Sequence, residues 1–271
     1  MSKKIVSVQD ISCYGQCSLT VALPILSAYG IETAILPSAI LSTHTGGFTG
    51  FTVHDLTEEM PQIINHWVKE NIKFDGIYTG YIGDARQFEM IKSMKSLMNE
   101  GGKLIVDPAM ADNGKLYPAL NEDIVDGMRS LVSAADMILP NLTEAAFLLG
   151  DEYKECYTEA EVADILRRLT DMGPNTAILT GVSYEEGTIG AVSYNKTTNE
   201  MVAYFTEKIK KNYHGTGDVF SSVAIAEYLN GKEMQDVLAA ACEFVVQSIK
   251  NTLDDITHDY GVKFESVLNA R

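Results

Sequence analysis

The chain has 271 residues, of which 46% are hydrophobic and 21% charged, a composition typical of globular proteins and unlike that of disordered, collagen-like or small disulfide-rich chains. Lysine and arginine number 21 against 37 aspartates and glutamates, so the net charge is −16, which disfavours binding to nucleic-acid phosphates or anionic membrane surfaces. We therefore expect small molecules or further copies of this chain as partners, with no nucleic acid and no membrane.

Short β-branched runs alternate with segments of helical periodicity as far as Thr180. In chain order we predict a strand at Lys4–Gln9, a helix at Ser18–Tyr29, a strand at Thr33–Leu41, a helix at Leu56–Lys69, a strand at Gly76–Tyr81, a helix at Ala85–Asn99, a strand at Lys103–Asp107, a helix at Asp123–Ser133, a strand at Met137–Leu139, helices at Thr143–Leu149 and Glu159–Asp171, and a strand at Thr176–Thr180. Strands separated by helices require right-handed crossovers, so the pattern predicts a mostly parallel sheet covered on both faces.

The pattern changes after Gly181. The runs Ile189–Tyr194 and Met201–Phe205 predict an antiparallel hairpin at the sheet edge, and helices at Thr216–Leu229 and Met234–Asn251 follow. Because no repeat, linker or low-complexity segment marks a boundary, we predict one α/β domain over residues 1–271, a three-layer αβα sandwich. A small flap over residues 39–51 is compatible with this pattern.

The cellular location follows from simple features. No apolar run approaches the ~18 residues of a membrane span, and the start of the chain has no hydrophobic stretch of the signal-peptide kind. Four cysteines are too few for a disulfide framework in this length, and Cys13 and Cys17 lack partner ligands for zinc. We expect a cytoplasmic protein with reduced thiols.

The strongest local signal is His214-Gly215-Thr216-Gly217-Asp218, directly before an apolar helix. Its glycines leave backbone N–H groups bare at a helix N-terminus, which is a site for an anion such as a transferring phosphoryl group. The carboxylate of Asp218 could accept a hydroxyl proton there. The alternative is that Asp218 only complements the helix dipole, and the motif alone leaves both interpretations open.

Further polar residues follow other predicted strands, where ligands bind in parallel sheets. Asp107 ends the run Lys-Leu-Ile-Val, and Asp112 follows in a turn, so the pair could hold a hydrated Mg²⁺ or form an ordinary loop. Asn141 and Glu144 are spaced as a helix capping box, which we prefer in isolation, whereas a metal role needs Glu144 turned toward the ion's water shell. Thr180 could donate to a phosphate or belong to a plain turn.

The segment His44-Thr45-Gly46-Gly47-Phe48 is polar, rich in glycine and followed by aromatic residues. A loop of this kind after the second strand could cover a small aromatic ligand, although a surface loop is the alternative. His44 has no second ligand nearby, so we predict no metal there, and we interpret His258 as part of a polar tail. The P-loop, Rossmann and nucleophile-elbow motifs are absent from the sequence.

Taken together, six spaced motifs resemble those of the ribokinase-like superfamily and, within it, the pyridoxal/pyridoxamine kinases. They are SVQD…YG at 7–15, STHTGGFTG at 42–50, TGYIGD at 79–84, DPAMADNG at 107–114, PNLTEA at 140–145 and HGTGDVFSS at 214–222. The resemblance covers essentially the whole chain. It implies ATP-dependent phosphorylation of the 5′-hydroxymethyl group of pyridoxal, pyridoxamine or pyridoxine with Mg²⁺, usually in a homodimer and in some members with K⁺.

The resemblance also implies roles for individual residues. Asp218 matches the general base, with Gly215, Thr216 and Gly217 as the anion hole. Asp107, Asn141 and Thr180 match positions that contact ATP or its phosphates, and Asp107, Asp112 and Glu144 match acidic positions near Mg²⁺, acting through water. His44, Thr45 and Tyr81 match positions that hold the substrate ring.

Two residues depart from the family pattern. Asp10 stands where such kinases commonly carry serine beside the ring nitrogen, and Ala111 replaces a usual glycine. An ionised aspartate favours a protonated ring nitrogen, so the preference among vitamers is open. Two alternatives stay beside the leading interpretation: a hydroxymethylpyrimidine or hydroxymethylpyrimidine-phosphate kinase of the same fold, and a non-catalytic vitamer-binding protein.

Overall fold

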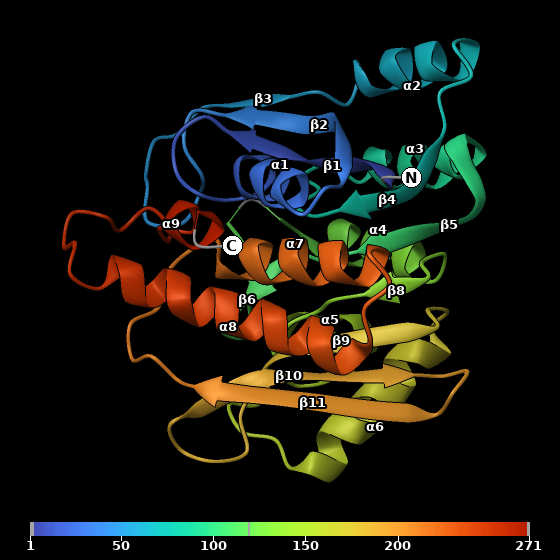
Figure 1. The fold of residues 1–271 in the computed structure, drawn as a ribbon. Helices are drawn as coiled ribbons and strands as arrows, with labels where there is room; N and C mark the ends of the chain where they lie inside the picture. The colour runs from blue at the N-terminus through green and yellow to red at the C-terminus, as the bar shows by residue number, and fades with distance from the viewer. Residues whose placement is uncertain (1–2, 119, 270–271) are drawn as a thin grey trace.

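The computed structural model describes residues 3–118 and 120–269. Within them, nine strands form one sheet in the order β11-β10-β9-β8-β5-β4-β1-β2-β3 (Figure 1). The strands are β1 (Lys4–Ser12), β2 (Glu32–Leu41), β3 (Val53–Asp55), β4 (Phe74–Thr79), β5 (Met98–Val106), β8 (Met137–Ile138), β9 (Thr176–Val182), β10 (Thr188–Asn195) and β11 (Glu200–Glu207). Neighbours from β2 to β9 are parallel, whereas β3 joins one edge antiparallel and the β10–β11 hairpin extends the other.

Helices cover both faces of this sheet. They are α1 (Leu19–Ala28), α2 (Met60–Lys69), α3 (Arg86–Ser93), α4 (Glu122–Val132), α5 (Leu142–Leu149), α6 (Glu159–Asp171), α7 (Thr216–Leu229), α8 (Met234–Thr252) and the short α9 (Glu265–Leu268). One hydrophobic core joins the sheet to α2 through α6, and a second joins it to α1, α7 and α8. Figure 1 shows α7 and α8 side by side across the second face. The predicted αβα sandwich with a mostly parallel sheet and an edge hairpin is confirmed.

Several element boundaries differ from the sequence prediction. The predicted helix Leu56–Lys69 begins only at Met60, because residues 53–55 pair with β2 as an unpredicted strand and the Leu56 amide continues this pairing by donating to the Ser38 carbonyl. The predicted helix Ala85–Asn99 ends at Ser93, and a 3-10 turn, η1 (Met94–Leu97), leads into β5. The side chains of β3 are all exposed, so no apolar alternation revealed the strand.

A small hairpin follows β5 and was not predicted either. Its strands are β6 (Ala111–Asp112) and β7 (Lys115–Leu116), and the two turn residues Asn113 and Gly114 have φ values of 50° and 74°. Positive φ at both central residues is the type I′ geometry that Asn-Gly favours. The hairpin gives the segment after Asp107 a fixed course beside α5.

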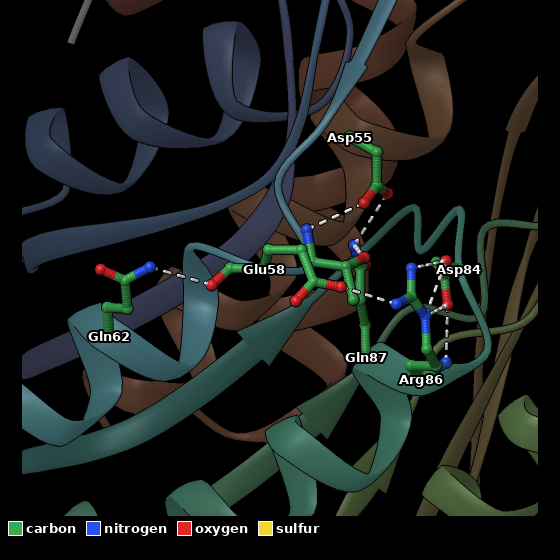
Figure 2. Close-up of polar contacts among 7 residues, drawn as sticks. Asp55, Glu58, Gln62, Asp84, Arg86 and Gln87 are labelled. Carbon is green, nitrogen blue, oxygen red and sulfur yellow. Dashed lines mark hydrogen bonds and ion pairs between the residues drawn. The ribbon is translucent and has the colours of Figure 1, made fainter.

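Side chains at the start of α3 connect it to the segment before α2. Figure 2 shows the Arg86 guanidinium between two carboxylates, with N–O distances of 2.8 Å to Asp84 and 2.7 Å to Glu58. Arg86 and Glu58 are largely exposed and Asp84 is half-buried, so the ion pairs add little to the free energy of unfolding.

The neighbouring Gln87 is buried, so its hydrogen bonds contribute more to the stability of this region than the Arg86 ion pairs do. Its Nε2 donates to the Ser38 carbonyl at 3.0 Å and to Thr57 Oγ1 at 2.8 Å. It also approaches Asp55 Oδ2 at 3.3 Å (Figure 2). Ser38 in turn donates its hydroxyl to the Tyr81 carbonyl at 3.3 Å. Because buried amides need partners, this network holds the loop that carries Tyr81 against β2.

Among residues 3–118 and 120–269, no helix combines the length and the apolar composition that crossing a bilayer requires.

Candidate active site

The glycine turn before α7 lies at the carboxyl ends of the parallel strands. Gly215 caps α7 with φ 76°, and a Cβ there would lie 1.9 Å from the carbonyl oxygen of Gln16. Both the backbone conformation and the lack of space therefore require glycine at this position. A Cβ on Gly217 would meet nothing within 4 Å, so there is open space beside the first helical turn, whose backbone amides have no acceptor within the helix. Such a turn can bind an anion.

Asp218 lies in that first turn and is partly buried. Burial raises the pKa of Asp218 to about 7, the charges of Asp107 and Asp10 act in the same direction, and the backbone amide of Ser18 opposes them. A carboxylate that only complemented the helix dipole would have a lowered pKa. Ser18 has φ 53°, a strained value for a non-glycine residue, which aims its amide into the site.

Asp107 directly follows β5 and is 6% exposed. Its Oδ2 accepts a hydrogen bond of 2.7 Å from Ser221 Oγ, and burial raises the pKa of Asp107 in spite of this bond. Ser221 is three residues after Asp218, so α7 presents both side chains on one face. Ser221 was not predicted from the sequence, although its i, i+3 spacing from Asp218 within the last motif was a usable signal.

Asn141 and Glu144 form the predicted capping box at the start of α5. Glu144 Oε2 accepts the Asn141 amide at 2.8 Å, and its Oε1 accepts the Met110 amide at 3.2 Å. Asn141 Nδ2 donates to the Ala111 carbonyl at 2.9 Å. Burial and the charge of Asp107 raise the pKa of Glu144 well above its ordinary value. The pair therefore caps a helix, anchors the loop after Asp107 and adds a buried carboxylate beside it.

Asp112 and Thr180 lie at the edges of this group. Asp112 is exposed in β6, where its carboxylate accepts both the amide and the side-chain N–H of Asn113. Thr180 forms an isolated bridge with Asn141, and its hydroxyl donates to the Pro140 carbonyl at 3.4 Å. Thr180 is thus brought beside Asn141, whereas Asp112 is held in a surface turn.

Asp10 lies near the end of β1, is 3% exposed and is close enough to Asp218 for its charge to act on that residue. The β1–β2 pairing shifts register between Gln9 and Ile11, so Asp10 sits opposite a bulge. Burial raises the pKa of Asp10, while hydrogen bonds from Ser18 and Ser12 lower it. The charge of Asp10 in turn helps burial to raise the pKa of Tyr81 to about 12, so that side chain is a neutral phenol near Asp10.

His44 is 4% exposed and has a defined tautomer. Its Nδ1 accepts the Gly46 amide at 3.2 Å, so Nε2 must carry the hydrogen that it shares with the Tyr260 carbonyl at 3.1 Å. Burial lowers the pKa of His44, which keeps the ring neutral. Because both nitrogens are engaged, His44 can meet a ligand only through its ring face or edge. Thr45 beside it is partly buried.

The site has an excess of negative charge. The pKa values of Asp10, Asp107, Glu144 and Asp218 are shifted by burial, by one another and by serine or backbone hydrogen bonds, and within the described residues no lysine or arginine contributes. Groups of three or more potential metal ligands are not found in that part of the chain. Among the described residues, the buried carboxylates of Asp107 and Glu144 have no lysine or arginine beside them. Such a pair suits a Mg²⁺ ion that keeps most of its waters.

Comparisons with known proteins agree with this geometry. The sequence profile of the phosphomethylpyrimidine kinase family matches residues 23–262. The chain belongs to this family. Its enzymes are phosphotransferases, and the ribokinase-like fold that the motifs indicated is confirmed.

Individual relatives point in the same direction. A Bacteroides thetaiotaomicron protein described as a phosphomethylpyrimidine kinase, crystallised with pyridoxal, is 38% identical with a TM-score of 0.95, over 100% of this chain and 96% of its own. The pyridoxal kinase of Lactobacillus plantarum is 30% identical with a TM-score of 0.91, over 99% and 96%. The pyridoxal kinase of Dictyostelium discoideum is 26% identical over 96% of this chain and 88% of its own. The resemblance to pyridoxal kinases is confirmed.

The raised pKa of Asp218 predicts a stability gain on its neutralisation. The folded state holds this proton up to about pH 7, whereas the unfolded chain releases it near the ordinary aspartate value, so ionisation of Asp218 destabilises the fold as pH rises through this interval. Asp218→Asn should therefore increase the free energy of unfolding at pH 8 by about 1–3 kcal/mol, measured by urea denaturation, with the gain closing near pH 4.

Asp236 provides the matched control, since it occupies the same position in the first turn of α8 but is exposed. Asp236→Asn should lower the free energy of unfolding by a few tenths of a kcal/mol to ~1 kcal/mol, the usual worth of a helix-dipole contact. A loss of similar size in Asp218→Asn at pH 8 would contradict the assignment.

Proposed function

We propose that this enzyme transfers the γ-phosphoryl group of ATP to the 5′-hydroxymethyl group of pyridoxal, pyridoxamine or pyridoxine. One observation carries the proposal: the Asp218 carboxylate, with its pKa near neutrality, lies in the first turn of α7 behind the glycine cap and close enough to Asp107 and Asp10 to feel their charges. The relatives support the substrate class, since one was crystallised with pyridoxal and others are pyridoxal kinases.

The proposed chemistry needs one proton acceptor. Asp218 takes the hydroxyl proton as the substrate oxygen bonds to the γ-phosphorus, and the bond to the β-phosphate oxygen breaks to release ADP. A pKa near 7 leaves a substantial fraction of Asp218 ionised at neutral pH. The amides of Gly215, Thr216 and Gly217 face the transferring group and stabilise its charge, a contribution that positioned donors make without reorganisation.

The acidic residues on the nucleotide side have a second proposed role. Asp107, Asp112 and Glu144 would hold Mg²⁺ through its waters, and the ion supplies neutralisation of phosphate charge. Both Glu144 oxygens accept backbone amides and Asp107 Oδ2 accepts Ser221, so outer-shell contact suits them better than direct ligation. Asn141 and Thr180 are proposed to face the phosphates. The homodimer, the use of K⁺ and a cytoplasmic location stay predictions from the resemblance.

On the ring side, His44, Thr45 and Tyr81 are proposed to enclose the aromatic substrate. Tyr81 can donate or accept with its neutral hydroxyl, and the engaged nitrogens of His44 leave its ring surface for contact. Asp10 is the polar group at the base of the site and is proposed to meet the ring nitrogen. A carboxylate there stabilises a pyridinium N–H more than a neutral nitrogen.

The family match favours a second candidate, phosphorylation of hydroxymethylpyrimidine or its phosphate. That substrate is also a hydroxymethylated aromatic ring, so the glycine turn and Asp218 would serve it equally. A non-catalytic vitamer-binding protein is disfavoured, because binding alone would not require a carboxylate with a raised pKa in the first turn of α7.

ADP release measured with ATP and each substrate separates these functions. We expect turnover with at least one B6 vitamer at a kcat/KM well above that with hydroxymethylpyrimidine. Asp218→Ala should lower kcat by roughly 10² or more and leave nucleotide affinity nearly unchanged, because the carboxylate acts on the hydroxyl proton. Turnover of hydroxymethylpyrimidine alone would establish the second candidate, and a near-normal kcat in Asp218→Ala would remove Asp218 as the base.

Asp10 gives a test of ring recognition. Asp10→Ser should change the KM values or the ranking of pyridoxal, pyridoxamine and pyridoxine, because serine suits a neutral ring nitrogen, and it should spare the KM for ATP. Steady-state kinetics on the three vitamers measure this. Identical kinetics of both enzymes on all three would show that Asp10 does not face the ring nitrogen.

A further inference from the structure

Six aromatic rings form a continuous chain along one side of the candidate site. In order they are His258, Tyr260, Tyr14, Phe48, His44 and His214, with successive centroid distances of 4.2, 4.8, 5.9, 5.0 and 5.5 Å. They come from the C-terminal segment after α8, the loop after β1, the loop after β2 and the glycine turn. Figure 1 shows the C-terminal segment turning back beside the first of these loops. A part of the chain distant in sequence thus borders the site.

The carbonyl oxygen of Tyr260 joins two of these loops. It accepts the backbone amide of Gln16 at 2.9 Å and Nε2–H of His44 at 3.1 Å. The His44 amide also donates to the Tyr14 carbonyl at 3.2 Å, so the two loops are tied to each other as well. The tautomer and the orientation of His44 therefore depend on an acceptor outside its own loop as well as on the Gly46 amide within it.

The side chain of Gln16 anchors the C-terminal segment through two hydrogen bonds. Its Oε1 accepts from His258 Nε2 at 2.9 Å, and its Nε2 donates to Glu265 Oε1 at 2.7 Å. His258 is 8% exposed, so it is packed here, contrary to its prediction as part of a polar tail. Gly261 permits the contact: its φ is 148°, and a Cβ there would lie 2.4 Å from Gln16 Cβ.

We propose that residues 258–261 are a positioning element of the ring site, in which the Tyr260 carbonyl holds His44 as its Nε2–H tautomer and fixes the loops that enclose the substrate ring. This inference rests on the proposed function for its kinetic consequence. The element contacts the loops after β1 and β2, whereas Asp107 and Glu144 on the nucleotide side are held by α7 and by the loop after β5. It should thus govern affinity for the ring substrate and leave ATP affinity unchanged.

Gly261→Ala tests the contact directly, since its methyl group must push the segment away from Gln16. Two readouts are taken: KM for pyridoxal and for ATP, and ¹⁵N NMR of histidine-labelled enzyme without substrate, with His44 assigned by a His44→Gln variant. We expect the KM for pyridoxal to rise about tenfold, the KM for ATP to stay within twofold, and His44 to lose its pure Nε2–H pattern.

Gly173→Ala is the matched control. Gly173 has φ 151°, and a Cβ there would lie 2.3 Å from the Ser133 carbonyl oxygen, so strain and crowding are comparable, but it precedes β9 at the opposite end of the sheet. A merely destabilised enzyme has less active protein with both KM values unchanged, which is the result expected for Gly173→Ala. If Gly261→Ala does not fold, Gln16→Leu removes the two side-chain contacts and should shift both readouts in the same direction.

Two results would overturn the inference. The first is an NMR pattern showing that His44 carries its hydrogen on Nδ1 in the wild type, or that it keeps its Nε2–H tautomer in Gly261→Ala. The second is a KM for pyridoxal that stays unchanged while the tautomer is lost. Failure of the wild type to phosphorylate any vitamer would instead refute the proposed function, because the NMR readout involves no substrate.

Discussion

Repulsion among buried carboxylates at the carboxyl ends of the parallel strands is the constraint on which the rest of the site depends. Asp10, Asp107, Glu144 and Asp218 come from four different segments, and burial raises the pKa of each. Buried charges without counter-charges destabilise a fold, so such a cluster persists only where other contacts determine it. Binding of substrate phosphates together with a divalent cation would explain why the carboxylate cluster is present.

The fold tolerates the cluster by giving each carboxylate its own donors. Ser221 donates to Asp107, the amides of Met110 and Asn141 donate to Glu144, and Ser12 donates to Asp10. Asp218, like Asp107, has a single donor: only the amide of the strained Ser18 lowers its pKa. The carboxylate in the first turn of α7 is therefore poorly stabilised in its ionised form, which suits a proton acceptor.

The sequence was sufficient to predict the architecture because its helices and strands carry strong local signals. The capping box at Asn141 and Glu144 was predicted and observed, and the edge hairpin followed from two β-branched runs. The exposed strand β3 and the start of β5 lacked such signals. Their positions follow from pairing with β2 and β4, which is tertiary context that local patterns do not contain.

The site was predictable where motifs carry chemistry, and not where distant segments meet. The open turn before α7 and the position of Asp218 in it follow from the glycines. The donation from Ser221 to Asp107 spans 114 residues, and the contact between His44 and Tyr260 spans 216. The engagement of both His44 nitrogens, and with it the orientation of that ring, therefore became visible only in the folded chain.

The most direct test of this account is the titration of the Asp218 carboxyl in the free enzyme, followed by ¹³C NMR of aspartate-labelled protein and assigned with Asp218→Asn. The account predicts a midpoint near pH 7, because burial and the neighbouring carboxylates oppose ionisation. A midpoint near the ordinary aspartate value of 3.8 would mean that Asp218 is a solvated partner of the helix dipole, and the account of the site would be wrong.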